Sequence, residues 1–248
     1  MYQGTAVAFD KIAADYGHLW NRTAIGSSQR KAIWRWIDPL FLPGDSVLDI
    51  GCGDGEDAVH LQARGVYVQG VDVSPEMVKR ARERGVRAEV LKAEDLDRIS
   101  GNFDGAVSNF GVLNCIGDLE QLAANLRRLI RPSGHVALCI MGRCCTWEVC
   151  HFLRRRELRK AFRRFSSEAS TSLGIHVRYP PTRTLRQAFR NGFSLRRWYG
   201  IGLFVPPSYV SGISDATLLR LAKVDREIAH WLVLRGLADH RLYLFRRV

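Results

Sequence analysis

Short apolar runs alternate with amphipathic stretches through residues 46–141 of the chain. Such runs are typical of buried strands, and the stretches between them repeat apolar residues at helical spacing. The expected strands are Ser46–Ile50, Val66–Val73, Arg87–Lys92, Phe103–Ser108 and His135–Ile140. Because strands that alternate with helices of this length form βαβ units, the pattern predicts an α/β protein with a mostly parallel sheet and helices on both faces.

The pattern changes after Gly142. Residues 146–165 predict one long helix with apolar side chains on one side and a row of arginine and lysine on the other. Further helices are expected at 182–190 and 214–235, and two final strands at 194–203 and 240–248, which complete a seven-stranded sheet. The first 40 residues also show helical spacing, for example Ala6, Phe9 and Ala13.

The composition is that of a globular protein, with 46% hydrophobic and 25% charged residues in 248. We expect one domain over residues 1–248. Its parts are an N-terminal helical cap (1–40), a ligand-binding core (41–142), a basic helical insert (143–180) and a C-terminal part of the sheet with helices (181–248). No apolar run reaches the length of a membrane span, and no signal peptide is recognisable, so we expect a cytoplasmic protein.

The formal net charge of +12 is concentrated in one segment. Residues 143–199 contain 14 basic and three acidic side chains, whereas the other 191 residues have a net charge of only +1. Such a segment attracts phosphate groups, nucleic acid or an anionic membrane; the alternative is a solvated helix face. The six cysteines have no metal-ligand spacing, so we expect no metal site.

The most informative stretch is Asp49-Ile50-Gly51-Cys52-Gly53-Asp54-Gly55, which lies between a predicted strand and a predicted helix. Alternate glycines let the backbone turn tightly and approach a ligand without hindrance from Cβ atoms. Glu56 occupies the position where a dinucleotide-binding loop needs its third glycine, and an acid there repels a pyrophosphate. Asp72, which closes the second strand 19 residues after Gly53, is a carboxylate suited to the two hydroxyls of a ribose.

The glycine loop and Asp72 resemble two motifs of class I S-adenosylmethionine (SAM) dependent methyltransferases, a family with a Rossmann-like fold. The resemblance continues, in family order, through four further motifs: Val73-Ser74-Pro75-Glu76-Met77, Ala93-Glu94-Asp95-Leu96, Phe103-Asp104 and Leu129-Ile130-Arg131-Pro132-Ser133-Gly134. It covers residues 9–142 well and implies an enzyme (EC 2.1.1.-) that uses SAM and releases S-adenosylhomocysteine. A SAM-binding protein without catalysis remains an alternative.

The resemblance also implies the cofactor-binding residues. It assigns the methionine part to the loop (Asp49, Gly51, Cys52, Gly53 and Gly55) and the ribose to Asp72. The adenine would lie against Val73 and Met77, with Ala93 and Glu94 at its edge, and Asn109 and Phe110 would lie under the sulfonium. Lys92 stands where many relatives have an acid, so recognition of the adenine amino group falls to Glu94 or Asp95. Tyr16 is expected either to cover the cofactor or to be a core residue.

The sequence gives only a weak indication of the methyl acceptor. Asn109-Phe110-Gly111-Val112 follows the fourth strand, where enzymes that methylate a base in nucleic acid usually have an N/D-P-P-aromatic motif. We therefore expect a small-molecule acceptor, anionic or lipid-like. An RNA or protein acceptor is the alternative, as is contact of the 143–199 segment with an anionic membrane. The catalytic base and the oligomeric state stay open; candidates for the base are His18, Asn114, His151, His176 and Tyr179.

Overall fold

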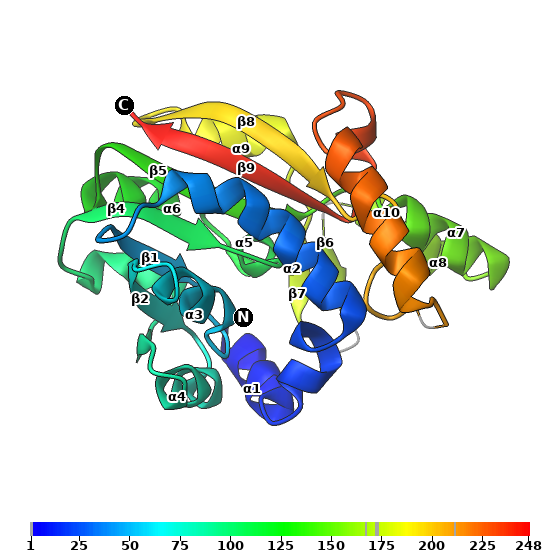
Figure 1. Cartoon of the computed structure of the whole chain (residues 1–248), viewed down its shortest axis with the longest axis horizontal. Helices are drawn as coiled ribbons and strands as arrows, with labels where there is room; N and C mark the ends of the chain where they lie inside the picture. The colour runs from blue at the N-terminus through cyan, green and yellow to red at the C-terminus, as the bar shows by residue number, and fades with distance from the viewer. Residues whose placement is uncertain (1, 167, 172–173, 211) are drawn as a thin grey trace.

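The computed structural model describes residues 2–166, 168–171, 174–210 and 212–248. Its centre is a seven-stranded sheet in the order β3-β2-β1-β4-β5-β9-β8 (Figure 1). The strands are β1 (Ser46–Ile50), β2 (Tyr67–Asp72), β3 (Arg87–Val90), β4 (Phe103–Ser108), β5 (Ile130–Met141), β8 (Phe193–Ile201) and β9 (His240–Arg247). The first five are parallel, and β9 pairs antiparallel with both β5 and β8. The predicted mostly parallel seven-stranded sheet is confirmed.

Helices cover both faces of this sheet, because the strands alternate their side chains between two apolar cores. On β5, Val136 and Leu138 belong to one core, and Ala137 and Cys139 belong to the other. The first core is covered by α6 (Leu119–Leu129) and α9 (Thr182–Phe189), beside the short α5 (Val112–Cys115). The second is covered by α2 (Ala24–Ile37), α3 (Glu56–Gln62) and α4 (Pro75–Glu83), with α2 lying across the sheet in Figure 1.

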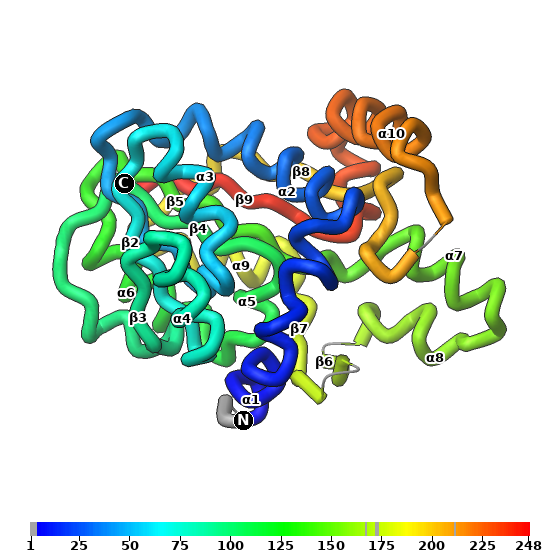
Figure 2. The backbone as a smooth tube through the Cα atoms, turned by 60° about the horizontal axis from the view of Figure 1, so that its bottom comes forward, coloured from blue at the N-terminus to red at the C-terminus, as the bar shows by residue number. Residues whose placement is uncertain are grey.

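The N-terminal helices lie at the edge of the sheet where the parallel strands end. These are α1 (Tyr2–Ile12) and a π-helical turn, η1 (Gly17–Asn21). Asp10 of α1 accepts hydrogen bonds from Ser74 Oγ at 2.5 Å and from the Glu76 N–H at 3.2 Å, at the start of α4. On its other side α1 packs beside β7 (His176–Arg178), as Figure 2 shows. The predicted helical cap is therefore held from both sides.

Two of the predicted helices are shorter than expected. The single helix predicted over 146–165 is wrong: the structure has α7 (Thr146–Arg154), α8 (Leu158–Ala161) and a 3-10 turn, η4 (Arg163–Phe165). The break follows from Arg156, whose φ of +58° lies in the left-handed region and ends the helix. The helix predicted over 214–235 ends early, as α10 (Asp215–Ile228) followed by η5 (Leu234–Gly236).

Three more elements belong to the described part of the chain. They are η2 (Asp38–Leu40), η3 (Ala93–Arg98) and β6 (Glu168–Ser170), and β6 pairs antiparallel with β7 in a separate two-stranded sheet. The sequence pattern gave no sign of this small sheet. Among the described residues, no helix has the length and hydrophobicity needed to cross a membrane.

A buried ion-pair cluster fastens the insert to the main sheet. Glu148 of α7 is fully buried and accepts hydrogen bonds from Arg163 at 2.8 and 3.0 Å and from Arg164 at 2.8 and 3.1 Å. Arg164 also donates to Asp239, next to β9, at 2.7 Å. Although burial raises the pKa of Glu148, the two guanidinium groups bring it below its ordinary value, so the carboxylate is charged at neutral pH.

We predict that Glu148→Ala lowers the free energy of unfolding by about 3–5 kcal/mol, because the change leaves the buried Arg164 with too few partners. Urea denaturation at pH 7 measures it. The contribution disappears as the pH falls through the lowered pKa of Glu148 in the folded state. Glu157→Ala is the matched control, since Glu157 pairs with Arg155 and Lys160 near the surface of the same insert and its loss leaves the unfolding midpoint almost unchanged. Equal effects of the two variants would contradict the anchoring role.

Candidate functional site

The glycine loop, residues 51–55, joins β1 to α3 where the strands end. Three glycines of the loop have positive φ angles, which residues with a Cβ atom rarely adopt: +71° at Gly51, +54° at Gly53 and +82° at Gly55. A Cβ on Gly51 would lie 2.3 Å from a methyl carbon of Val112, so this position has no room for a side chain or a ligand. A Cβ on Gly53 would meet only the Tyr16 ring, at 4.0 Å. The loop is therefore tightly packed beneath and open at Gly53, where a ligand can approach the backbone.

Asp72 lies beside this open position at the end of β2. Its carboxylate accepts the Gly53 N–H and the Ser74 N–H, both at 2.9 Å. Burial raises the pKa of Asp72, and hydrogen bonds from backbone N–H groups oppose that rise. Two carboxylate oxygens can accept about four hydrogen bonds, so acceptor capacity remains for hydroxyl groups of a ligand.

Two buried polar groups at the ends of β1 and β4 lack partners. Within the described ranges, Oδ2 of Asp49 has no hydrogen bond, and the Asn109 amide, which lies beside the Asp57 carboxylate, has none of normal geometry. Burial, together with the nearby charges of Asp57 and Asp72, raises the pKa of Asp49 well above its ordinary value. Because buried polar groups without partners are costly, these two side chains fit a polar or cationic ligand that supplies the missing bonds.

Tyr16 closes the space above the loop. The centre of its ring lies 5.0 Å from the ring centre of Trp20 and 6.4 Å from that of Phe9, and both residues are on the N-terminal helices. Burial raises the pKa of Tyr16 to about 12, and the neighbouring Asp54 and Asp72 contribute to the rise. The phenol therefore stays neutral and faces the same space as the glycine loop and Asp72.

Arg30, which the sequence analysis did not identify, ties the N-terminal helices to the loop. Its guanidinium forms a buried ion pair with Asp57, in the first turn of α3, and donates to the side-chain amide oxygen (Oδ1) of Asn21 at 2.8 Å. Asn21 in turn donates to both oxygens of Asp54, in the loop, at 2.7 and 2.9 Å. The guanidinium also lies 4.6 Å from the centre of the Phe110 ring, after β4. One cation thus contacts three of the segments that surround the site.

The expected adenine-side residues lie at the ends of the neighbouring strands. Val73, which is half-buried, follows β2, and the side chain of Met77 is buried in the first turn of α4. Ala93, Glu94 and Asp95 open η3 after β3 and are half-buried, and Glu94 accepts the Gly117 N–H at 3.3 Å. The loop residue Cys52 is buried against Gly70 of β2. The structure therefore brings the predicted cofactor-binding residues to one edge of the sheet.

The five candidates for a catalytic base are not brought together. His18 and His176 are exposed. His151 on α7 packs against Tyr209, with 5.5 Å between the centres of the two rings. The buried Asn114 amide donates to the carbonyls of Met141 at 3.3 Å and Arg178 at 2.6 Å, and it accepts the Met141 N–H at 2.8 Å. Tyr179 is buried in the small core beside α1. The engaged Asn114 amide holds β5 to β7, and a catalytic role for any of the five stays a prediction.

A different histidine lies next to Phe110. His240 begins β9, pairs with Met141 at the end of β5, and places its ring edge-on to Phe110 at 5.4 Å. Its Nδ1 atom is 3.2 Å from the carboxylate of Asp239, which the Glu148–Arg164 cluster holds in place. No local motif marks His240, because it reaches the site through strand pairing with a distant segment.

Comparisons with known proteins agree with this geometry. Residues 47–134 match the family model described as a methyltransferase domain. A demethylmenaquinone methyltransferase of Corynebacterium kroppenstedtii is 31% identical over 134 residues, which are 53% of this chain and 57% of that protein. A malonyl-[acyl-carrier protein] O-methyltransferase of Salmonella typhimurium is 40% identical over 95 residues, 37% of either chain. The chain thus spans little more than half the length of the first of these relatives.

Solved structures share the fold. A SAM-dependent methyltransferase of Mesorhizobium loti aligns with a TM-score of 0.60 and 19% identity, over 87% of this chain and 98% of that one. The 1,6-didemethyltoxoflavin-N1-methyltransferase of Burkholderia thailandensis, solved with 1,6-didemethyltoxoflavin and S-adenosylhomocysteine, aligns with a TM-score of 0.60 and 18% identity, over 99% and 87%. Residues 47–134, which include the glycine loop and Asp72, are therefore similar to a methyltransferase domain, and the solved SAM-dependent methyltransferases share the fold of the chain.

Proposed function

We propose that this protein transfers a methyl group from SAM to a small-molecule acceptor in the cytoplasm. The observation that carries the proposal is the Asp72 carboxylate, held by the N–H of Gly53 at the open position of the glycine loop. When bound, SAM supplies a methyl group on a sulfonium, which needs only an aligned nucleophile. The chain's own contribution is to bind SAM and the acceptor, to orient them toward each other and to exclude water.

The residues fit the parts of SAM in a definite order. The unpartnered Asp49 oxygen and the glycine loop suit the charged methionine end, and Asp72 suits the ribose hydroxyls. The adenine is assigned to the cluster at the ends of β2 and β3: Val73, Met77, Ala93, Glu94 and Asp95. Asn109 and Phe110 then flank the sulfonium, with Tyr16 as the cover. These roles are proposals that rest on placement, burial and unpartnered polar atoms.

The acceptor is proposed to approach over Phe110, between Arg30 and His240. Phe110 has a φ of +53°, a conformation that costs energy for a residue with a side chain and is often found at functional sites. The Nδ1 atom of His240 lies 3.2 Å from the Asp239 carboxylate but forms no hydrogen bond of normal geometry, and we add His240 to the candidates for a group that takes a proton from an O- or N-acceptor.

Two other functions stay open. A ribosomal protein L11 methyltransferase of Burkholderia thailandensis is 34% identical over 106 residues. This match supports a macromolecular acceptor as the first alternative. The [4+2]-cyclase SpnF has the same fold, with a TM-score of 0.64 and 15% identity over 99% of this chain and 96% of that one. Since fold alone does not fix activity, a SAM-binding protein without methyl transfer is the second alternative.

We predict that Asp72→Ala weakens binding of S-adenosylhomocysteine at least tenfold, because it removes charge-assisted hydrogen bonds of about 1.5–3 kcal/mol each. Titration calorimetry measures the affinity, and circular dichroism checks the fold. Asp97→Ala, which removes an exposed carboxylate on η3, is the matched control and leaves affinity unchanged. A folded Asp72→Ala protein with parental affinity would disprove the ribose assignment.

We predict that methyl-labelled SAM passes its label to small molecules rather than to RNA or protein. A cell extract, separated into a low-molecular-weight fraction, total RNA and total protein, is incubated with the enzyme, and label in each fraction is counted. Asp72→Ala serves as the inactive control. Label in RNA or protein alone would replace the small-molecule proposal, and tight SAM binding without transfer to any fraction would favour a non-catalytic role.

A further inference from the structure

An apolar tip projects from the segment between α10 and η5. Trp231, Leu232 and Val233 are consecutive and are 53%, 77% and 78% exposed. Three neighbouring large apolar side chains are seldom left in water without a partner. The tip is not needed for the described cores, which contain none of the three residues.

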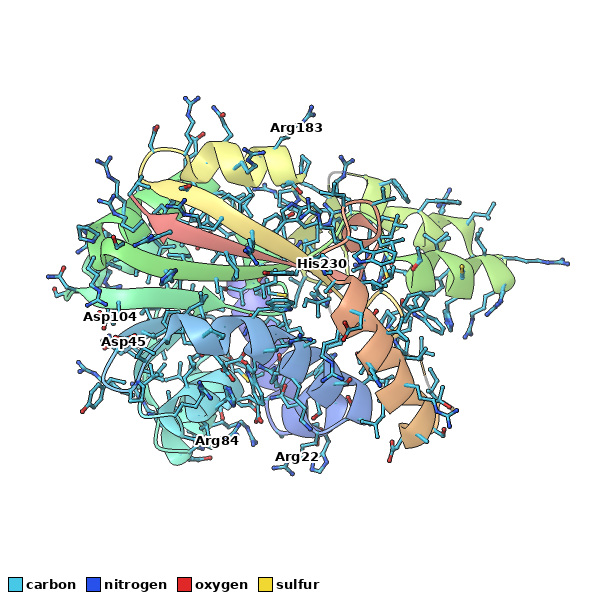
Figure 3. All side chains as sticks on the ribbon, turned by 45° about the horizontal axis from the view of Figure 1, so that its top comes forward. Arg22, Asp45, Arg84, Asp104, Arg183 and His230 are labelled. Atoms are coloured by element: carbon cyan, nitrogen blue, oxygen red, sulfur yellow. The ribbon has the colours of Figure 1, made fainter. Side chains whose placement is uncertain are left out.

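Arginines border this tip on the outer edge of the sheet. A shallow cavity of about 630 Å³ runs along β8, and Arg186, Arg196, Arg197, Arg235 and His230 line it together with Trp36 and Trp198. Figure 3 shows His230 where the chain leaves α10 and meets the strands. The Arg235 guanidinium lies 3.8 Å from the centre of the Trp198 ring. No carboxylate lines the cavity, and these four arginines form no ion pair with any described residue.

The basic segment 143–199 therefore has two unlike parts. In the insert, Arg163 and Arg164 pair with Glu148, and Arg155 and Lys160 pair with Glu157, whereas Arg154, Arg156 and Arg159 form no ion pair with a described residue. Along α9 and β8 the arginines have no acidic partner, and their positive field is not cancelled. The β8 edge therefore combines arginines that have no acidic partner with the three consecutive exposed residues of the tip.

We propose that the tip and the arginine border form a site for the surface of an anionic membrane. The apolar tip distinguishes this partner from nucleic acid, because phosphate binding needs the arginines but gains nothing from Leu232 and Val233. Tryptophan at the level of the lipid headgroups, with leucine and valine below it and arginine beside it, is the arrangement of peripheral membrane contacts. The proposal is independent of methyl transfer.

Sedimentation with vesicles tests the site. The 248-residue protein is mixed with vesicles of phosphatidylcholine alone or of phosphatidylcholine with about 30% phosphatidylglycerol, in about 0.1 M salt. We expect binding to the anionic vesicles only. The combined change Trp231→Ser, Leu232→Ser and Val233→Ser should weaken it at least about tenfold, because each buried CH₂ contributes to the affinity. Arg196→Gln with Arg197→Gln should weaken it by about tenfold as well.

Leu158→Ser with Phe162→Ser is the matched control, since these side chains are 60% and 48% exposed on the basic insert. We expect this variant to bind vesicles as the parent does. An equal or larger loss in the control would overturn the proposal and assign the contact to the insert. If the arginine variant loses binding while the tip variant keeps it, or if total RNA competes fully with the vesicles, the surface is a general polyanion site and the proposal is wrong. Binding of S-adenosylhomocysteine, measured in each variant, should stay at the parental value.

Discussion

The buried guanidinium of Arg30 is the interaction on which the arrangement of the site depends. A buried charge is tolerated only when it is paired and hydrogen-bonded, and Arg30 obtains its partners from separate segments: Asp57 of α3 and Asn21 of η1, with the Phe110 ring beside it. Asn21 also donates hydrogen bonds to Asp54, which fixes the glycine loop relative to η1. Movement of the cap or of the end of β4 relative to the loop would therefore cost the buried guanidinium a hydrogen bond or its contact with the ring, and movement of α3 would cost it its ion pair.

A second buried arginine has the same effect on the other side of the site. Arg164 links Glu148 of the insert to Asp239, and Asp239 lies against His240, whose ring contacts Phe110. The two networks meet at Phe110, where the Arg30 guanidinium lies over the ring and the His240 ring is edge-on to it. In the sequence, the basic insert shows only an excess of positive charge, but one of its arginines, Arg164, ties it to the main sheet through Glu148 and Asp239.

The sequence predicted what is local and missed what is long-range. The β1 strand, the glycine loop and Asp72 were identified because their spacing alone encodes strand, turn and strand end. Arg30 and Asn21 were missed because their partners lie 27 and 33 residues away, with no motif to join them. The broken helix at Arg156 was missed because the apolar spacing continues across a backbone reversal. How the acceptor side is built depends on strand pairing between β5 and β9, which composition does not reveal.

The central claim is that this loop, with Glu56 after its last glycine and Asp72 beside Gly53, binds SAM and not a dinucleotide. Titration calorimetry of the parental protein with S-adenosylhomocysteine and, separately, with NAD tests it most directly. The account predicts one S-adenosylhomocysteine bound per chain and no heat from NAD beyond dilution. Saturable binding of NAD with no response to S-adenosylhomocysteine would contradict it.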